Sequence, residues 1–187
     1  MEKNIPILQA NPSEKDLIDL QNYDIQEKVG QIDKWKYYNL INISDKINYF
    51  AKSSSNFLDN FQRGAVIDFF REIDINSKIK YPTILNFVGY SLTNFKSKGK
   101  PVIITEYASN YTLKSRLHQI KEYVDFIDWN DTKKLIVIYG IASGMSFLHS
   151  HNIIHCNLNL ESIFLDQNFL SKITNFNCSK NHLKTIL

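Results

Sequence analysis

Several residue types are scarce in this sequence, and each shortage excludes a class of protein. There are two cysteines, Cys156 and Cys178, and their separation fits neither a CxxC pair nor a zinc-binding pattern. We therefore expect two free thiols in a reducing compartment. Arginine occurs three times and the net charge is +3. Because guanidinium groups make the bidentate contacts with phosphates and guanines, we expect no nucleic-acid partner.

Long hydrophobic runs are also missing. The longest apolar-rich stretch, from Leu135 to Leu148, is shorter than the roughly 18 apolar residues that a membrane-spanning helix needs. The N-terminus, which begins Met1-Glu2-Lys3, has no apolar core of a signal peptide. We therefore expect a cytoplasmic protein that does not bind membranes. With 43% hydrophobic and 22% charged residues, the chain has the composition of a globular protein with one core or two small lobes.

The first half of the chain predicts a small β-rich unit with one helix. Residues 1–20 are polar and contain two prolines, which favours a loosely held leader. Alternating apolar and aromatic positions predict strands at 23–29, 37–41, 47–52, 84–90 and 102–106. Between the third and fourth strands, apolar residues at helical spacing predict an amphipathic helix over 60–79, which Pro82 would stop.

Helical patterns dominate the second half, from Tyr107 onward. Asp131 is the predicted N-cap of a helix that runs to about Ser150, and apolar residues cover nearly all faces of this helix. Two short strands are predicted at 162–165 and 171–174, on either side of a turn at 166–168. A helix that is apolar all round needs packing partners on every side.

Several spaced motifs resemble those of protein kinases. Phe50-Ala51-Lys52 is similar to the V-A-I-K strand, and Glu72 lies where kinases have the glutamate of the C-helix. Residues 103–107 resemble the gatekeeper and hinge, 148–155 the approach to the catalytic loop, and 172–177 the K-I-x-D-F-G strand. The resemblance covers about residues 20–180, and its details are similar to the tyrosine-kinase-like group.

The resemblance implies an α+β protein-kinase-like fold. Residues 1–20 would be a flexible leader, and residues 21–106 would form an N-lobe with five strands and the C-helix. Residues 107–187 would form a partial, mainly helical C-lobe that ends just after the D-F-G position.

The resemblance also implies ATP and Mg²⁺ as cofactors and assigns residues to their site. Lys52 would hold the α- and β-phosphates and Glu72 would fix Lys52 in place. If Lys52 or Glu72 occurred alone, it would be interpreted as a solvated side chain. Because the two residues are separated in the sequence as in kinases, the resemblance favours an ion pair between them. The remaining nucleotide-binding positions are Gly30, Thr105, Glu106, Tyr107 and Phe164.

The catalytic-loop motif H-R-D-L-x-x-x-N corresponds to residues 155–162 of this chain, where its catalytic residues are replaced. His155 is retained, but Asn157 occupies the position of the catalytic base and Asn159 that of the lysine two residues further on. An amide is not basic, so it does not accept the proton of an attacking hydroxyl. The two metal positions hold Ser162 and Asn175, and Mg²⁺ prefers anionic oxygen. No catalytic or metal position is intact.

The nucleotide site is altered as well. Of the three glycines in the phosphate loop only Gly30 remains, and Ile32 and Trp35 align with the other two. Tyr37 aligns with the roof of the adenine site and is expected to face the floor residue Phe164. We therefore expect ATP binding to be weak or absent. A zinc site at His149, His151 and His155 is disfavoured, because the kinase frame places them at a helix end and in the catalytic loop.

The sequence stops about ten residues after Asn177, before the activation segment and the helices that follow it in kinases. The helix 131–150 normally packs on those helices, so we expect one of its apolar faces to be uncovered. This predicts self-association or a protein partner, with Leu135, Ile138, Ile141 and Met145 as contact residues.

Three functions are compatible with these observations. The first is a catalytically inactive pseudokinase that acts as a binding or regulatory module. The second is a protein kinase that transfers the γ-phosphoryl of ATP to protein hydroxyls with atypical metal dependence. The third is a non-functional fragment of a decayed kinase gene. Nucleotide titration with and without Mg²⁺, followed by thermal shift, is the experiment that distinguishes best among them.

Overall fold

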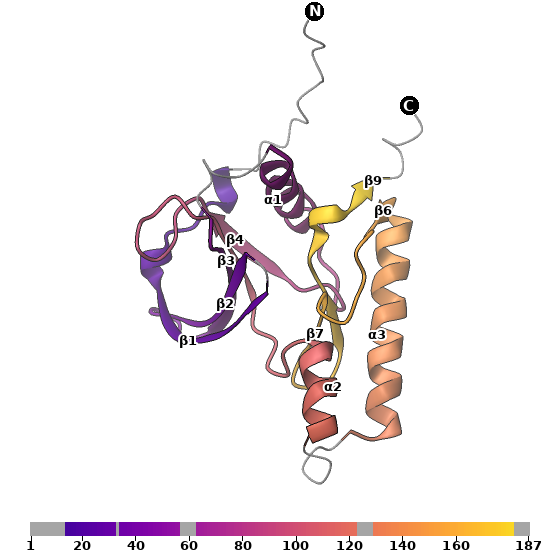
Figure 1. Ribbon diagram of the computed structural model, residues 1–187. Helices are drawn as coiled ribbons and strands as arrows, with labels where there is room; N and C mark the ends of the chain where they lie inside the picture. Colours follow the sequence, from indigo (N-terminus) through magenta and orange to yellow (C-terminus); the bar gives the residue numbers. More distant parts are fainter. Residues whose placement is uncertain (1–13, 33, 57–62, 123–128, 182–187) are drawn as a thin grey trace, which may run out of the picture.

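The computed structural model describes residues 14–32, 34–56, 63–122 and 129–181, and within these ranges the chain forms a β-rich lobe and a mainly helical lobe (Figure 1). This is the α+β kinase-like architecture that the motifs imply. Within these ranges there is no helix long and apolar enough to cross a membrane.

The β-rich lobe contains the five predicted strands in one antiparallel sheet. Their order is β1 (Tyr23–Ile32), β2 (Trp35–Asn42), β3 (Asn48–Ser54), β5 (Val102–Glu106) and β4 (Phe87–Ser91). One face of the sheet buries Leu40, Ala51 and Ile104 in a common hydrophobic cluster. β4 begins later than predicted, because Ile84 instead forms an isolated bridge with Ile173 of the other lobe.

The helix α1 (Arg63–Asn76) packs beside this sheet. Its buried residues Phe69 and Ile73 form a cluster with Tyr90 and Ile103 of the sheet, which confirms the predicted amphipathic helix. The structured helix ends at Asn76, earlier than the sequence pattern predicts, and residues 57–62 lie outside the described part of the chain.

Part of the predicted leader is packed on the sheet. Between two short 3-10 turns, η1 (Glu14–Asp16) and η2 (Leu20–Asn22), the amide of Ile18 donates to the carbonyl of Tyr90 over 3.0 Å. Ile18 lies so close to Gly89 that a Cβ there would come within 2.4 Å of its Cγ2. The segment therefore extends the core at β4, and residues 1–13 lie outside the described residues.

Among the described residues, the helical lobe is built on two helices and two small ladders. Its elements are α2 (Leu113–Glu122), α3 (Asp131–Ser150), β6 (Ile153–Ile154), β7 (Ile163–Leu165), β8 (Ser171–Ile173), η4 (Phe176–Cys178) and β9 (Lys180–Asn181). The predicted helix at 131–150 is confirmed, but Asp131 is not its N-cap. The side chain of Asn130 caps it instead, accepting from the amide of Lys133 over 3.0 Å.

Two glycines let α3 lie directly on β8. A Cβ at Gly140 would come within 3.0 Å of the amide nitrogen of Ser171, and one at Gly144 within 2.7 Å of Ile173 Cδ1. The predicted contact residues Ile141 and Met145 are partly buried, and each packs against a core cluster.

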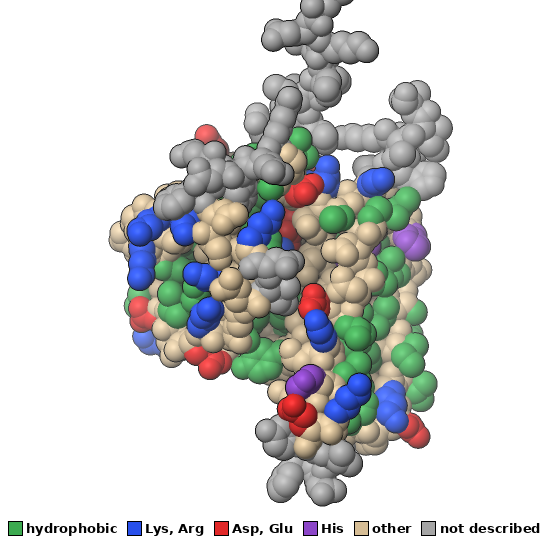
Figure 2. All heavy atoms as spheres, viewed as in Figure 1, with side chains coloured by type: hydrophobic (Ala, Val, Ile, Leu, Met, Phe, Trp, Pro, Cys, Tyr) green, Lys and Arg blue, Asp and Glu red, His purple; other side chains and the backbone are tan. Residues whose placement is uncertain are grey.

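The opposite face of α3 exposes large apolar side chains. Leu135 is 66% exposed, Ile138 is 61% exposed and Tyr139 is 70% exposed. Figure 2 shows hydrophobic side chains along the side of the molecule where Figure 1 places α3. The structure thus confirms exposure of Leu135 and Ile138 and adds Tyr139 to the uncovered face.

Candidate functional site

The lysine and glutamate that the motifs pair are in contact between β3 and α1. Lys52 Nζ lies 2.8 Å from both carboxylate oxygens of Glu72 and donates to Asn175 Oδ1 over 2.9 Å. Glu72 is 2% exposed and Lys52 is 9% exposed. The indole of Trp35 covers the same ammonium, with 4.7 Å from Nζ to the ring centroid. The donors of Lys52 are therefore directed at groups of the chain itself.

Asn175 reaches Lys52 from the turn before η4. Its backbone is left-handed, with φ 67°, a conformation that asparagine adopts more readily than most residues. Its amide oxygen accepts a hydrogen bond from Lys52 as a carboxylate would, but it carries no charge. The Lys52–Glu72–Asn175 group is therefore neutral overall, whereas an aspartate at this position would leave one negative charge for a metal ion.

A ring of β3, Phe50, occupies the space between the lobes. In a strand, side chains two residues apart share a face, so Phe50 points to the same side of the sheet as Lys52. Its ring centroid lies 5.1 Å from that of Phe164 and 5.9 Å from that of Tyr37. That Tyr37 faces Phe164 stays a prediction, and the structure adds Phe50 as a third ring that packs with both.

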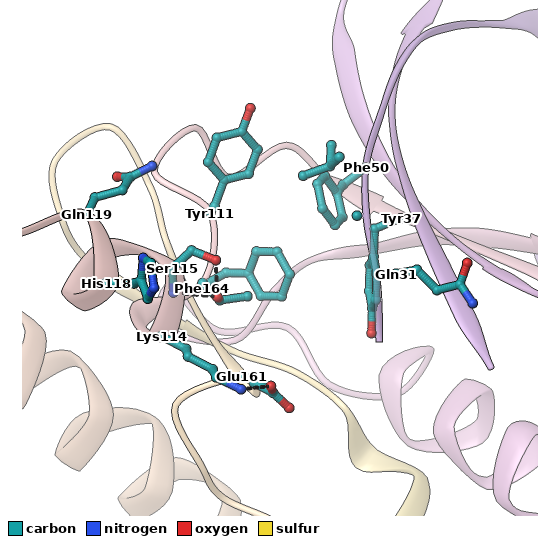
Figure 3. A pocket seen from close by; sticks show the side chains of 13 residues that line it. Gln31, Tyr37, Phe50, Tyr111, Lys114, Ser115, His118, Gln119, Glu161 and Phe164 are labelled. Atoms are coloured by element: carbon teal, nitrogen blue, oxygen red, sulfur yellow. Dashed lines mark hydrogen bonds and ion pairs between the residues drawn. The ribbon is translucent and has the colours of Figure 1, made fainter. Parts of the chain in front are cut away.

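Phe50, Tyr37 and Phe164 divide the cleft in two. The inner part, beside Lys52 and Glu72, is a void of only about 20 Å³. The outer part is a cavity of about 470 Å³ between the strands and α2 (Figure 3). Lys52 and Asn175 do not line the outer cavity, so a ligand held there has no direct access to them.

The outer cavity has an aromatic wall and a polar wall. Figure 3 shows Tyr37 and Phe50 on the strand side and Ser115 and His118 on α2, on the other side of the opening. The Lys114 ammonium on α2 forms an ion pair with Glu161 of the catalytic loop. The charges of this wall therefore largely compensate each other.

The three predicted gatekeeper and hinge residues have structural contacts. Thr105 is buried and lines the inner void, and its hydroxyl donates to the Glu106 carbonyl over 3.2 Å. The Glu106 carboxylate binds Lys172 of β8 at 3.0 Å and also accepts from the amide of Asn86. Tyr107 packs on the Phe50 cluster, and burial raises the pKa of its phenol. These contacts join the two lobes at the hinge.

The retained histidine of the catalytic loop is a buried structural group. His155 Nε2 lies 2.8 Å from the carbonyl of Thr174, and Nδ1 accepts from the amide of Asn157 over 3.2 Å. This pattern needs a neutral ring with the proton on Nε2. Burial holds the pKa of His155 below its usual value of 6.5, against the opposing influence of Thr174 and Glu72.

The three replaced residues of the loop hydrogen-bond to each other. Asn159 Nδ2 lies 3.1 Å from the carbonyl of Asn157 and 3.2 Å from its Oδ1. The hydroxyl of Ser162 donates to the Asn159 carbonyl over 2.9 Å and accepts from the Asn159 amide over 2.9 Å. The Ser162 hydroxyl is therefore engaged in stabilising the turn. Across the described ranges, no three His, Cys, Asp or Glu side chains are grouped to hold a metal ion.

The phosphate-loop positions give a mixed result. Gly30 lies on β1 opposite Tyr37, with open space where a Cβ would be, and it lines the outer cavity. Trp35 does more than replace a glycine, because its ring stacks on Phe69 of α1 at 6.3 Å while it covers Lys52. The side chain of Ile32 lies outside the described part of the chain.

Sequence reasoning missed the residue that closes the cleft. Phe50 stands where the V-A-I-K motif has a small alanine, two residues before Lys52, and this substitution was the available signal. The α2 residues of the outer cavity, such as Lys114 and His118, belong to no motif and had no signal. The ion pair of Glu106 with Lys172 had no sequence signal either, because it joins residues far apart in the sequence.

Comparison with known families gives a consistent result. The family described as protein tyrosine and serine/threonine kinase matches residues 41–185. The probable leucine-rich repeat receptor-like protein kinase IMK3 of Arabidopsis thaliana is 32% identical over 60% of this chain and 14% of its own length. The tyrosine-protein kinase receptor svh-2 of Caenorhabditis elegans is 30% identical over 67% of this chain and 11% of its length.

A third similar protein is a leucine-rich repeat receptor-like protein kinase of Arabidopsis thaliana whose name describes it as probably inactive. It is 32% identical over 60% of this chain and 11% of its own length. The matched chain thus spans between 11% and 14% of the lengths of these three relatives.

Proposed function

We propose that this chain, which belongs to the protein tyrosine and serine/threonine kinase family, is a catalytically inactive kinase domain. It would act as a binding or regulatory module. The family implies ATP and Mg²⁺. The described residues do not fit that pair, because the cleft is closed by rings and the two metal positions hold Ser162 and Asn175. A cytoplasmic location stays a prediction.

One observation carries the proposal. Phe50 packs with Phe164 and Tyr37, and these three rings line both the outer cavity and the small inner void beside Lys52, so they separate the two spaces. A nucleotide in the outer cavity would have to pass its phosphates beyond these rings, into a void of only about 20 Å³, in order to reach Lys52. Without a bound nucleotide no phosphoryl group is available for transfer.

Opening the cleft is the direct test. The wild-type chain should show no thermal stabilisation by ATP, with or without Mg²⁺. Phe50→Ala should gain a nucleotide-dependent rise of the melting temperature, since a ligand at a hundred times its Kd stabilises by ~2.7 kcal/mol. Phe169→Ala is the matched control, because Phe169 is also buried but lies in the α2–α3 cluster.

The alternative, an active kinase with atypical metal dependence, is favoured by the intact Lys52–Glu72 pair. It predicts Mg²⁺-dependent incorporation of radiolabelled phosphate that disappears in Lys52→Ala. We expect no incorporation by the wild type. Asn157→Asp alone should not restore transfer, because Ser162 and Asn175 would still occupy the metal positions. A clear Mg-ATP stabilisation of the wild type that requires Lys52 would contradict the proposal.

The exposed face of α3, defined by Leu135, Ile138 and Tyr139, is the proposed binding surface. Each large apolar side chain left in water forgoes ~1.5 to 3 kcal/mol of burial, which favours covering it with a protein partner or a second copy of the chain.

Sedimentation of the purified chain at several concentrations tests this surface. Self-association that Leu135→Gln and Ile138→Gln together abolish is the expected result, and Ile47→Gln should leave it unchanged. Ile47 is a suitable control because it is exposed to a similar degree but lies before β3. A monodisperse monomer at all concentrations would contradict self-association. A chain that unfolds without cooperativity would favour the third function, a non-functional fragment.

A further inference from the structure

Four aromatic rings line the outer cavity. Figure 3 shows Tyr111 and Phe164 on one side of the opening and Phe50 and Tyr37 on the other. The ring of Phe50 is inclined by 36° to that of Tyr37 and by 72° to that of Phe164. A flat base stacks best between parallel rings, whereas rings set at angles around one space suit a rounded group such as a substituted ammonium. The rings are thus arranged as a cage and not as a slot.

One ring of this cage is held by a strained backbone. Tyr111 has φ 55°, a left-handed conformation that is unusual for a bulky side chain. Its amide donates to the carbonyl of Ala108 over 3.2 Å, and its carbonyl accepts from the amide of Leu165 over 2.9 Å. Backbone strain that neighbouring bonds enforce is concentrated at binding and active sites. The conformation of Tyr111 therefore favours a ligand-binding role for its ring.

Two basic side chains of the polar wall are paired with carboxylates. The ammonium of Lys114 forms an ion pair with Glu161, which also lines the cavity. His118 Nδ1 lies 3.4 Å from a carboxylate oxygen of Glu122. Each of these basic groups therefore already faces an acidic group of the chain, which disfavours a phosphate-bearing ligand at this wall.

A further carboxylate lies beside the cage. Glu27 of β1 accepts from the hydroxyl of Tyr111 over 3.3 Å and from the side-chain amide of Asn39. Both of these donors are uncharged, so they do not compensate the charge of the carboxylate. A cation among the rings would be attracted both by the ring faces and by Glu27, and each attraction is stronger where water is excluded.

We propose that the outer cavity binds an organic cation, a substituted ammonium group on a small aromatic or aliphatic body. Its volume of about 470 Å³ lies in the range of roughly 300 to 1,000 Å³ that is usual for small-molecule sites. The ammonium would lie among the rings near Glu27, and the body would extend toward Ser115 and Gln119, whose side chains offer hydrogen bonds. This inference rests on the proposed function, since it names the ligand of a domain whose cleft does not hold ATP.

Titration calorimetry of the purified full chain with a matched pair of probes tests the proposal. The cation is (meta-hydroxyphenyl)trimethylammonium, and meta-tert-butylphenol has nearly the same shape with carbon in place of the charged nitrogen. We expect the cation to bind about tenfold more tightly than this phenol. An anion of similar size, meta-hydroxybenzoate, should bind more weakly than either.

Substitutions separate the charge from the rings. Glu27→Gln removes the charge and keeps an oxygen for Tyr111, so it should weaken binding of the cation about threefold and leave the phenol unchanged. Tyr111→Leu removes one ring and should weaken binding of the cation about tenfold. Asp24→Asn is the matched control, because Asp24 is an exposed carboxylate on the same strand that does not line the cavity, and it should change neither affinity.

Three results with the wild type would overturn the inference. They are equal affinity for the cation and the phenol, tighter binding of the benzoate, and no binding of the cation at millimolar concentration. These results do not depend on the folding of any variant. Mg-ATP, titrated in parallel, tests the proposed function separately. Binding of Mg-ATP through Lys52 would contradict the proposed function, whereas absence of binding by both Mg-ATP and the cation would contradict only this inference.

Discussion

The inner and outer parts of the cleft are separated by Phe50 and differ in packing and in access to solvent. On the inner side the ion pair of Lys52 with Glu72 is buried beside a void of about 20 Å³. On the outer side the ion pair of Lys114 with Glu161 lies at the edge of a cavity of about 470 Å³. The two parts contain the same kind of charge pair in opposite environments.

This difference shows which part of the kinase frame the fold needs. A buried charge costs several kcal/mol unless a partner compensates it, so Lys52, Glu72 and Asn175 depend on one another even without a nucleotide. An exposed pair is solvated with or without its partner and contributes little. Retention of Lys52 and Glu72 is therefore explained by stability and does not by itself indicate catalysis.

The largest expected effect comes from removing one partner of the inner pair. Lys52→Ala leaves the 2% exposed Glu72 carboxylate without its cation, and we expect the free energy of unfolding to fall by about 3 to 5 kcal/mol. Lys114→Ala is the matched change on the outer side, where about 0 to 1 kcal/mol is expected. Urea denaturation measures both. Equal losses of unfolding free energy in the two variants would mean that the inner and outer ion pairs contribute equally to stability.

An intermediate effect is expected from filling the two spaces. Thr105→Phe adds a ring beside the inner void, which is too small for it, and should cost about 1 to 3 kcal/mol through overpacking. Ser115→Phe adds the same ring to the wall of the outer cavity, where there is room, and should change stability by no more than about 0.5 kcal/mol. Thermal unfolding compares the two variants. A large loss in Ser115→Phe would show that the outer cavity is not open.

The smallest expected effect is a pH dependence at the inner end. Burial lowers the pKa of His155, so the unfolded chain takes up a proton below about 6.5 while the folded chain does not. The stabilisation from this residue is therefore complete above that pH and is lost as the pH falls toward the lowered pKa. His155→Phe should have a flatter dependence of unfolding free energy on pH below 6.5, whatever its absolute stability. Identical slopes would mean that His155 titrates normally.

Much of the fold was predictable because its signals are local. The helix at 131–150 and the strand at 102–106 have the predicted bounds, since each has a clear apolar pattern over its own length. The contact of Lys52 with Glu72 followed from the motif spacing. The cap of the long helix was missed by one residue, because Asn130 and Asp131 are both good caps and only the observed bond to Lys133 distinguishes them.

The division of the cleft had one local signal, Phe50 at the alanine position of V-A-I-K, but that signal does not specify which residues the ring meets. The division requires the ring of Phe50 on β3 to meet Phe164, which comes from the other lobe. Glu106 is a similar case, because a hinge residue expected at the nucleotide binds Lys172 of β8 instead. Contacts of this kind depend on how two lobes are placed, which no periodicity in either segment specifies.

The sequence by itself determined which chemical groups stand at the catalytic and metal positions, because the identity of a side chain fixes whether it can carry charge or accept a proton. Asn157, Ser162 and Asn175 lack a carboxylate in any fold. The tertiary structure alone decided what fills the cleft and what faces solvent, because packing joins residues that are distant in the chain. It placed Phe50 between the lobes and left Leu135 uncovered on α3.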